Sequence, residues 1–230
     1  MKRNRNISRL KVPHNKHTAA MPSVRIAPPE EVLLPMQMHS GQAAVPVVEA
    51  GDAVRIGQLV AREEGAISSP VYATISGTVA AIEPYEAGGR KTQAIRIKGD
   101  GKMEKDPALE APQVSNLDEF LAAVQKSGIV GLGGAAFPLW KKLDAVRRNK
   151  IKTVLVNGAE CEPYITSDTR TMLEHSDMIV KGVSLLRKYL QAEEFVIGIE
   201  KNKPEAIAEM QRVFAGDATV RVLELDCVYP

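Results

Sequence analysis

Two regions of the chain differ in how hydrophobic and polar positions are arranged. From Val32 to Lys98, short apolar runs are interrupted by Gly, Pro and Asp, as in SPVYATISGTVAAI. Val54 and Ile56 alternate with polar neighbours and precede a turn at Gly57. Alternation of this kind between turn residues is typical of short β-strands. This region is therefore predicted to be a compact all-β domain.

After residue 115 the pattern becomes one of helices and strands in alternation. SNLDEFLAAVQKSG has apolar positions at helical spacing, with Ser115 or Asn116 as the N-cap and Gly128 as the stop. Another helix is expected from about Pro138 to Arg148. Beyond it, β-branched runs that predict buried strands alternate with amphipathic segments that predict helices: KTVLVNG, DMIVKGVSLLRKYLQA, EFVIGIE, KPEAIAEMQRVFA and TVRVLEL. Such alternation indicates a parallel sheet with helices on its faces.

These patterns predict an α+β fold overall, with the all-β part first and an α/β part after it. A polar, proline-containing stretch separates the two and has the composition of a linker. Only DCVYP follows the last predicted strand, an abrupt end that suggests a truncated α/β domain. The predicted divisions are a basic N-terminal tail (1–30), the all-β domain (31–100), the linker (101–115) and the α/β domain (116–230).

Composition narrows the class of protein. With 44% hydrophobic and 25% charged residues, the chain resembles soluble globular proteins, and a net charge of +2 implies no general attraction to nucleic acid. No apolar run approaches the roughly 20 residues that span a bilayer, and no secretory signal is visible, so a cytoplasmic location is expected. Basic residues without acidic ones between Met1 and Met21 predict a solvated tail, with contact to anionic lipid or an acidic partner as the alternative.

The cysteines and histidines predict no metal site. Cys161 and Cys227 are the only cysteines, and an iron–sulfur cluster or structural zinc site needs about four soft ligands. The four histidines are scattered along the chain. No histidine is placed to activate Cys161, which is interpreted as a packing residue. No catalytic side chain is predicted.

The segment GIVGLGGAAFPLWKKL, from Gly128 to Leu143, holds four glycines within its first seven residues. Glycine lets main chain approach another surface closely, and the start of a helix favours an anion such as phosphate. Lys141 and Lys142 would add positive charge one turn inside that helix. The segment matches neither the dinucleotide fingerprint nor the P-loop, so an ordinary tight turn is the alternative.

A second candidate lies where a predicted strand ends, in VLVNGAECEP. Ligands of open α/β sheets bind beyond the carboxyl ends of the strands. Asn157 can both donate and accept hydrogen bonds, whereas Glu160 and Glu162 can accept them from ribose or ribityl hydroxyls. Acid–base catalysis, a hard metal site and an incidental surface loop are the alternatives for the two glutamates.

The all-β region resembles the barrel-sandwich hybrid of biotinyl and lipoyl carriers. The resemblance rests on VEAGDAVRIGQLVA followed by SPVYATISGTVAAIE. Carriers bear a modified lysine at the tip of a hairpin, and here the tip expected at Glu64–Ser69 reads EGAISS, without a lysine. A structural or docking role is therefore expected for this domain instead of a carrier role.

GLGGAAFP…K and NGAECEP…D together resemble the flavin-binding core shared by the NADH-oxidising subunit of respiratory complex I and the C subunit of the Rnf complex. The Rnf-type family is the more similar, because it too has an N-terminal barrel-sandwich domain reading GD.V..GQ.IA…SPVH…SGTV. The segment VIGIEKNKPEAI also looks like that family, so the resemblance covers nearly all of the chain after about residue 30. Complex I usually has arginine where Leu132 stands and aspartate where Ala159 stands.

The resemblance implies a Rossmann-like domain that binds FMN and NAD(H). It implies electron transfer between NAD(H) and iron–sulfur centres in an ion-translocating ferredoxin:NAD⁺ oxidoreductase, beside other membrane and electron-transfer subunits and, indirectly, ferredoxin. The expected position is peripheral, on the inner face of the cell membrane. Family members hold [4Fe–4S] clusters through cysteine motifs that this chain lacks. By resemblance, the cofactor contacts are Gly131, Gly133, Gly134 and Ala135 around the flavin, Lys142 at ribityl or phosphate, Asn157 at the flavin, and Glu160 and Glu162 on its flavin and nicotinamide sides.

Two further interpretations remain open at this point. One is a soluble flavoprotein reductase of the same family, similar to cobalamin reductases. The other, from a different class, is a docking or scaffold module whose α/β half binds no cofactor. Flavin binding by the chain distinguishes the scaffold from the flavoproteins.

Overall fold

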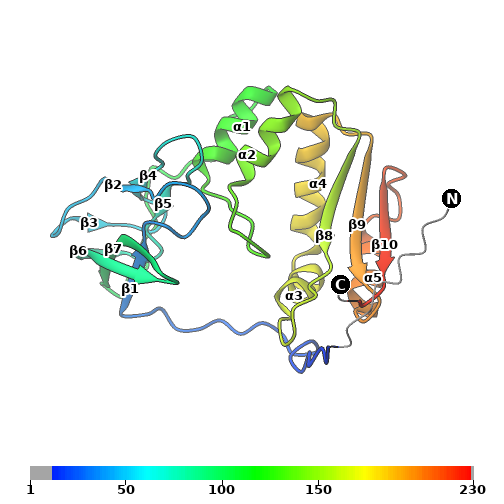
Figure 1. The fold of residues 1–230 in the computed structure, drawn as a ribbon, viewed down its shortest axis with the longest axis horizontal. Coiled ribbons are helices and arrows are strands. Elements are labelled where there is room, and N and C mark those ends of the chain that lie inside the picture. The colour runs from blue at the N-terminus through cyan, green and yellow to red at the C-terminus, as the bar shows by residue number, and fades with distance from the viewer. Residues whose placement is uncertain (1–11, 229–230) are drawn as a thin grey trace. The chain divides into compact units, whose positions relative to one another are not determined.

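The computed structural model describes residues 12–228 and divides into two compact units (Figure 1). One unit runs from Arg25 to Asn149. The other combines the chain before Arg25 with the chain from Lys150 onward, so it is discontinuous in sequence. Five of the basic residues noted near the N-terminus, Lys2, Arg3, Arg5, Arg9 and Lys11, lie outside the described residues.

Two antiparallel sheets form most of the Arg25–Asn149 unit, which confirms the all-β prediction for its first part. Alternating apolar residues from both sheets build its core, in which Met36, Val60 and Ile95 are fully buried. The four-stranded sheet has the order β1 (Glu31–Pro35), β7 (Arg90–Gly99), β6 (Gly77–Ala87), β3 (Ala53–Val54), and the three-stranded sheet has the order β2 (Val45–Pro46), β4 (Leu59–Arg62), β5 (Val71–Tyr72).

Gly77 shows why the SGTV motif needs glycine. It begins β6 and pairs with Gly99 of β7. A Cβ atom at this position would lie 2.0 Å from the carbonyl oxygen of Lys98. No side chain fits there, so the close pairing of β6 with β7 depends on this glycine.

The hairpin of β4 and β5 ends in a tip, residues 63–70, that is built into the unit. Ser68 and Ser69 are both buried. The Ser69 hydroxyl donates to the carbonyl of Gly128 at 3.1 Å, and the Trp140 indole donates to the carbonyl of Ser68 at 3.5 Å. A tip fixed by these contacts is consistent with the structural role expected from the missing lysine.

Helix α1 (Leu117–Lys126) is confirmed with Asn116 as its N-cap. The Asn116 side chain accepts a hydrogen bond from the backbone N–H of Glu119, and the Glu119 carboxylate accepts from the N–H and hydroxyl of Ser115. Such reciprocal capping satisfies donors that a helix start leaves free. Part of the predicted linker before it is also fixed, since Ile56 exchanges backbone hydrogen bonds with Glu104 and Asp106.

The helix predicted over 138–148 is wrong in length. Helix α2 spans only Leu139–Leu143 and continues as a 3-10 turn, η1 (Asp144–Arg147). No residue of η1 is fully buried, so the turn gains little of the packing that usually stabilises a longer helix. A helix of five residues has little dipole, so the helix start alone gives weak support for anion binding.

In the other unit, the predicted parallel α/β arrangement is confirmed. Helices pack on the sheet through a core that contains Phe195, Ile197, Ile199 and Met210. The strand order is β10 (Val220–Leu225), β9 (Glu194–Glu200), β8 (Thr153–Gly158), and the helices are α3 (Ser167–Glu174), α4 (Ser176–Leu190) and α5 (Pro204–Val213). Helix α3 was not predicted, because SDTRTMLE offers few apolar positions.

The described part of the N-terminal segment is fixed on this second unit. Thr18 and Thr166 share a hydroxyl–hydroxyl hydrogen bond of 2.6 Å, and Arg170 donates to the carbonyl of Ala19 at 3.3 Å. The side chain of Lys16 is only 14% exposed. A solvated tail is therefore the wrong description of this part of the segment.

Candidate functional site

The glycine segment forms a closed loop between α1 and α2. The N–H of Gly131 donates to the carbonyl of Phe137 at 3.0 Å, and the N–H of Leu139 donates to the carbonyl of Ile129 at 2.9 Å. These two bonds tie the base of the loop, whose tip residue Leu132 is 93% exposed. The loop is consequently held in place while its surface stays open.

Ser40 fixes the second half of the loop. Its N–H donates to the carbonyl of Ala136 at 3.0 Å, and its hydroxyl donates to the carbonyl of Ala135. The predicted contacts Gly131, Gly133, Gly134 and Ala135 thus lie together on one exposed loop, and Lys142 is exposed on the short helix that follows.

No contact and no backbone angle within the described residues explains why positions 131, 133 and 134 are glycine. A Cβ atom at Gly133 or Gly134 would meet no atom within 4 Å, and one at Gly131 would lie 3.9 Å from the Phe137 carbonyl. None of the three has the positive φ that favours glycine. Neither internal packing nor backbone conformation therefore requires glycine at these three positions, and their backbone is open to close approach by another molecule.

The second predicted segment begins at the carboxyl end of β8, in the other unit. Asn157 is exposed, and its side-chain oxygen accepts from the N–H of Ala159 at 3.1 Å. This turn leads into a loop of residues 159–166, which ends at α3. Asn157, Glu160 and Glu162 are therefore brought together by one turn and one loop.

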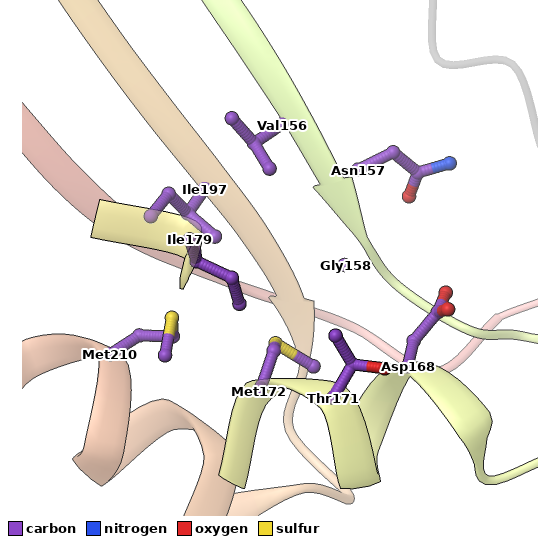
Figure 2. Close-up of a pocket in the computed structure, with 9 residues that line it drawn as sticks. All are labelled: Val156, Asn157, Gly158, Asp168, Thr171, Met172, Ile179, Ile197 and Met210. Atoms are coloured by element: carbon purple, nitrogen blue, oxygen red, sulfur yellow. The ribbon is translucent and has the colours of Figure 1, made fainter. Parts of the chain in front are cut away.

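A cavity of about 160 Å³ opens beside this strand end (Figure 2). It is smaller than the roughly 300–1,000 Å³ of most small-molecule sites, so it can hold only part of a cofactor. Its lining is mostly apolar, with Asn157, Asp168 and Thr171 as polar members; the others are Val156, Gly158, Met172, Ile179, Ile197 and Met210.

Asp168 was missed as a site residue. It opens α3 and lines the cavity. Desolvation raises the pKa of its carboxyl, and the nearby charges of Glu160 and Glu162 raise it further. The aspartate of the motif NGAECEP…D was the only signal in the sequence.

The carboxylate of Glu160 is buried and bonded to other residues of the chain. It is 1% exposed and accepts hydrogen bonds from the N–H of Asp168 at 2.6 Å and from the N–H and hydroxyl of Thr169 at 3.4 and 2.6 Å. These are donors at the start of α3, where a negative charge is stabilising. The geometry gives this carboxylate a capping role that the sequence did not reveal.

Glu162 differs from Glu160 although only one residue separates them. Its side chain is exposed, and within residues 12–228 its carboxylate makes no hydrogen bond or ion pair. Of the two predicted glutamates, only Glu162 has its carboxylate available for a ligand.

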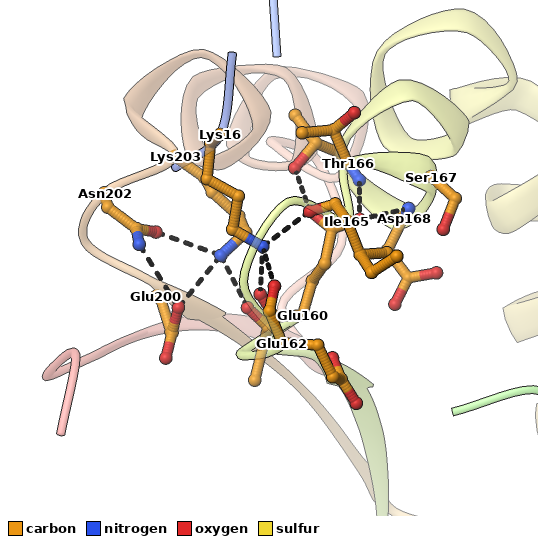
Figure 3. A network of polar contacts seen from close by, with 12 residues as sticks. Lys16, Glu160, Glu162, Ile165, Thr166, Ser167, Asp168, Glu200, Asn202 and Lys203 are labelled. Carbon is orange, nitrogen blue, oxygen red and sulfur yellow. Dashed lines mark hydrogen bonds and ion pairs between the residues drawn. The ribbon is translucent and has the colours of Figure 1, made fainter. Parts of the chain in front are cut away.

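Two lysines hold the backbone of this loop from the inside (Figure 3). Lys203 donates to the carbonyl of Ala159 at 2.6 Å and forms a 3.0 Å ion pair with Glu200, in which each side chain is 4% exposed. Lys16 donates to the carbonyls of Glu160, Glu162 and Ile165 at 2.7, 2.9 and 2.5 Å. Neither lysine was predicted to take part in the site.

The N-terminal segment has a pH-sensitive attachment at Glu174. The N–H of Ser23 donates to its carboxylate at 2.9 Å. That bond and the adjacent Arg170 lower the pKa of Glu174 from 4.5 to about 2. A carboxyl with a lowered pKa stabilises the fold above its ordinary pKa, and this contribution is lost as the pH falls towards about 2.

We expect the Ser23 amide resonance in NMR to titrate near pH 2, because its N–H donates to the Glu174 carboxylate. A midpoint at 4.5 would show that the bond is absent.

Two absences concern only the described residues. Between residues 12 and 228, no cluster of three His, Cys, Asp or Glu side chains could hold a metal ion. Within the same range, no helix has both the length and the apolar character to cross a membrane.

Comparison with known proteins gives two family matches. Residues 8–102 match the RnfC barrel sandwich hybrid domain, and residues 124–230 match the Nuo51 FMN-binding domain. The second match begins within α1, so it includes both the glycine loop and the segment after β8. The barrel-sandwich and FMN-domain assignments made from the motifs are confirmed at the level of family.

Curated relatives agree with these matches. The chain is 42% identical over 220 residues to the C subunit of the proton-translocating ferredoxin:NAD(+) oxidoreductase complex of Clostridium ljungdahlii, covering 94% of this chain and 48% of the relative. It is 36% identical over 223 residues to the C subunit of the Na(+)-translocating complex of Acetobacterium woodii (95% and 50%), and 37% identical over 225 residues to the C subunit of the ion-translocating oxidoreductase complex of Yersinia pestis (95% and 36%). The chain spans half or less of the length of these relatives.

Proposed function

We propose that this chain is the FMN- and NAD(H)-binding part of an Rnf-type C subunit, because its first matched region is an RnfC barrel sandwich hybrid domain, its second is a Nuo51 FMN-binding domain, and C subunits of such complexes align with nearly all of it. The observation that carries the proposal is the match of residues 124–230 to an FMN-binding domain, a region that includes the exposed loop with its three open glycines. The matched region 124–230 would serve as a Rossmann-like FMN-binding domain, and it includes the glycine loop as well as the α/β sheet. When bound, FMN supplies hydride and single-electron chemistry, and the protein supplies binding and orientation.

The residues present fit such a cofactor. The backbone of Gly131, Gly133, Gly134 and Ala135 is open to a flat ring, and Lys142 offers an exposed cation for phosphate or ribityl oxygens. In the other unit, Asn157 and Glu162 have exposed polar side chains at the end of β8, where open α/β sheets bind ligands. We propose Asn157 and Glu162 as contacts to the flavin or nicotinamide, and we assign Glu160 to the same loop as the group that holds it in shape.

At the level of the whole complex, the proposal includes electron transfer between NAD(H) and iron–sulfur centres beside other subunits, with ferredoxin as an indirect partner. The peripheral position on the inner membrane face belongs to the same proposal. This chain has two cysteines, so the clusters would be held by other polypeptide segments. The curated names of the relatives support the oxidoreductase class.

Titration of the purified chain with FMN tests the proposal. We expect flavin fluorescence to be quenched on binding, and anaerobic NADH to bleach the bound flavin. A chain that leaves flavin fluorescence unchanged would contradict the proposal and favour a scaffold module. Quenching without bleaching would support FMN binding and overturn the NAD(H) part.

Gly134→Val is expected to weaken FMN binding by about tenfold or more, equivalent to about 1.4 kcal/mol. The new side chain meets open space in the chain, so the free energy of unfolding should change by less than about 0.5 kcal/mol. Gly216→Val is the matched control, because a Cβ atom there also meets nothing within 4 Å. Equal FMN affinity for Gly134→Val and the control would remove the glycine loop from the site.

A further inference from the structure

We propose that Lys16 is a positioning residue for cofactor binding, with its ammonium group in a cation site formed by the loop of residues 159–166. The inference rests on the proposed function, because it assigns this loop to the cofactor. It concerns the chain's own residues and has readouts that need no bound flavin.

The cation site consists of three backbone carbonyls and one carboxylate. The Lys16 Nζ atom lies 2.7, 2.9 and 2.5 Å from the carbonyl oxygens of Glu160, Glu162 and Ile165, and 3.9 Å from Oε2 of Glu160 (Figure 3). An ammonium group has three N–H donors, and each finds one carbonyl. Convergence of so many oxygens on one point is otherwise typical of a bound monovalent cation.

The loop needs this support because its backbone is strained. Glu160 has φ of +49° and Tyr164 has φ of +68°, in the left-handed region that non-glycine residues seldom adopt. Such conformations persist only when surrounding contacts impose them. The carbonyls that Lys16 binds belong to Glu160 itself, to Glu162, and to Ile165, which follows Tyr164 directly.

Other contacts keep Lys16 in place. We call residues 14–23 the strap. Its His14 carbonyl accepts from the N–H of Tyr164 at 2.9 Å, and its Thr18 hydroxyl bonds to Thr166. The strap therefore contacts both residues with a left-handed φ, Glu160 and Tyr164, and residues next to them. More than 140 residues of sequence separate the strap from this loop.

The consequence falls on Glu162. Its carbonyl is held by Lys16 while its side chain is exposed. Fixing the backbone fixes the position of the Glu162 Cα atom and the direction of its Cα–Cβ bond, so only side-chain torsions remain to be ordered when a ligand binds. Loss of the ammonium group should thus weaken FMN binding although Lys16 itself contacts no cofactor.

Lys16→Ala tests the inference in the full chain. We expect faster hydrogen exchange of amides in residues 159–166 without FMN, and about tenfold weaker FMN binding. Ammonium or methylammonium ions should restore both, because they fit a vacated ammonium site, whereas tetramethylammonium at equal ionic strength should not. Lys181→Ala is the control, since that lysine has a 67% exposed side chain in a surface ion pair and should change neither readout.

The outcomes separate the two proposals. Unchanged exchange and unchanged FMN affinity in Lys16→Ala would overturn the positioning role. Lack of rescue by small cations would overturn the cation-site description. If the wild type binds no FMN but the variant still loosens the loop, the proposed function fails and the structural part of the inference stands. Should Lys16→Ala fail to fold, Thr18→Val provides the milder test, with a smaller shift in the same direction expected.

Discussion

Replacing Lys203 with methionine is expected to lower the free energy of unfolding of the α/β unit by about 3–5 kcal/mol. Lys203 and Glu200 are 3.0 Å apart and each side chain is 4% exposed, so removal of the cation leaves a buried carboxylate without its partner. The carbonyl of Ala159 loses its donor as well. Urea denaturation followed by circular dichroism measures the change.

Lys201→Met is the matched control for this prediction. Lys201 pairs with Asp226 at 2.8 Å, but the two side chains are 56% and 60% exposed, so its removal should cost about 0–1 kcal/mol. Replacing both members of the buried pair, Lys203→Met with Glu200→Leu, should recover part of the loss because no unpaired charge remains. Equal losses for Lys203→Met and Lys201→Met would show that the buried pair is unimportant.

Glu160→Ala is expected to cost about 3 kcal/mol of stability. The substitution removes a buried acceptor of three hydrogen bonds at the start of α3, one of them long at 3.4 Å. A hydrogen bond to a charged group contributes a net of about 1.5–3 kcal/mol, and water that enters beside the freed donors offsets part of the loss. FMN binding should weaken too, because the loop loses its shape. Denaturation and flavin titration of the same variant give both values.

Glu162→Ala is the contrasting variant. Its exposed carboxylate holds nothing in the described chain, so stability should change by less than about 0.5 kcal/mol while FMN affinity falls. A stability loss as large as that of Glu160→Ala would refute the division of roles between the two glutamates.

Local patterns were sufficient for most of the fold. Alternation between turns predicted the β-strands of the first unit, and β-branched runs predicted β8, β9 and β10 and their parallel pairing. Residue type and position narrowed the N-cap to Ser115 or Asn116, and the structure has Asn116. These features depend on neighbours in sequence, which a pattern displays directly.

The predictions were wrong where the secondary structure or burial of a segment depends on contacts with residues far away in the sequence. Helix α2 ends early, and the turn η1 that follows it has no buried residue. Helix α3 forms although its sequence is polar, since the Glu160 carboxylate caps its start. Lys16 stood in a basic run and was expected in solvent, yet its partners lie 144–149 residues away. The composition of a charge run does not reveal that Lys16, its one member among the described residues, has fixed partners.

The candidate site was predicted from glycine content, position after a strand, and resemblance. These signals pointed to the two segments but not to the different roles that Glu160 and Glu162 have within the second one. Glu160 is buried and Glu162 is exposed in a loop where Glu160 has a left-handed φ, which the residue type gives no reason to expect.

The discontinuous unit has a consequence for synthesis on the ribosome. Lys16 is translated 144 residues before Glu160, an interval of roughly 7–29 s at about 5–20 residues per second. Residues 25–149 emerge complete during that delay and can fold first, whereas the strap must wait for a partner that has not yet been made. An N-terminal fusion that occupies or tethers those waiting residues should therefore lower the yield of native protein, even though it leaves every helix and strand intact.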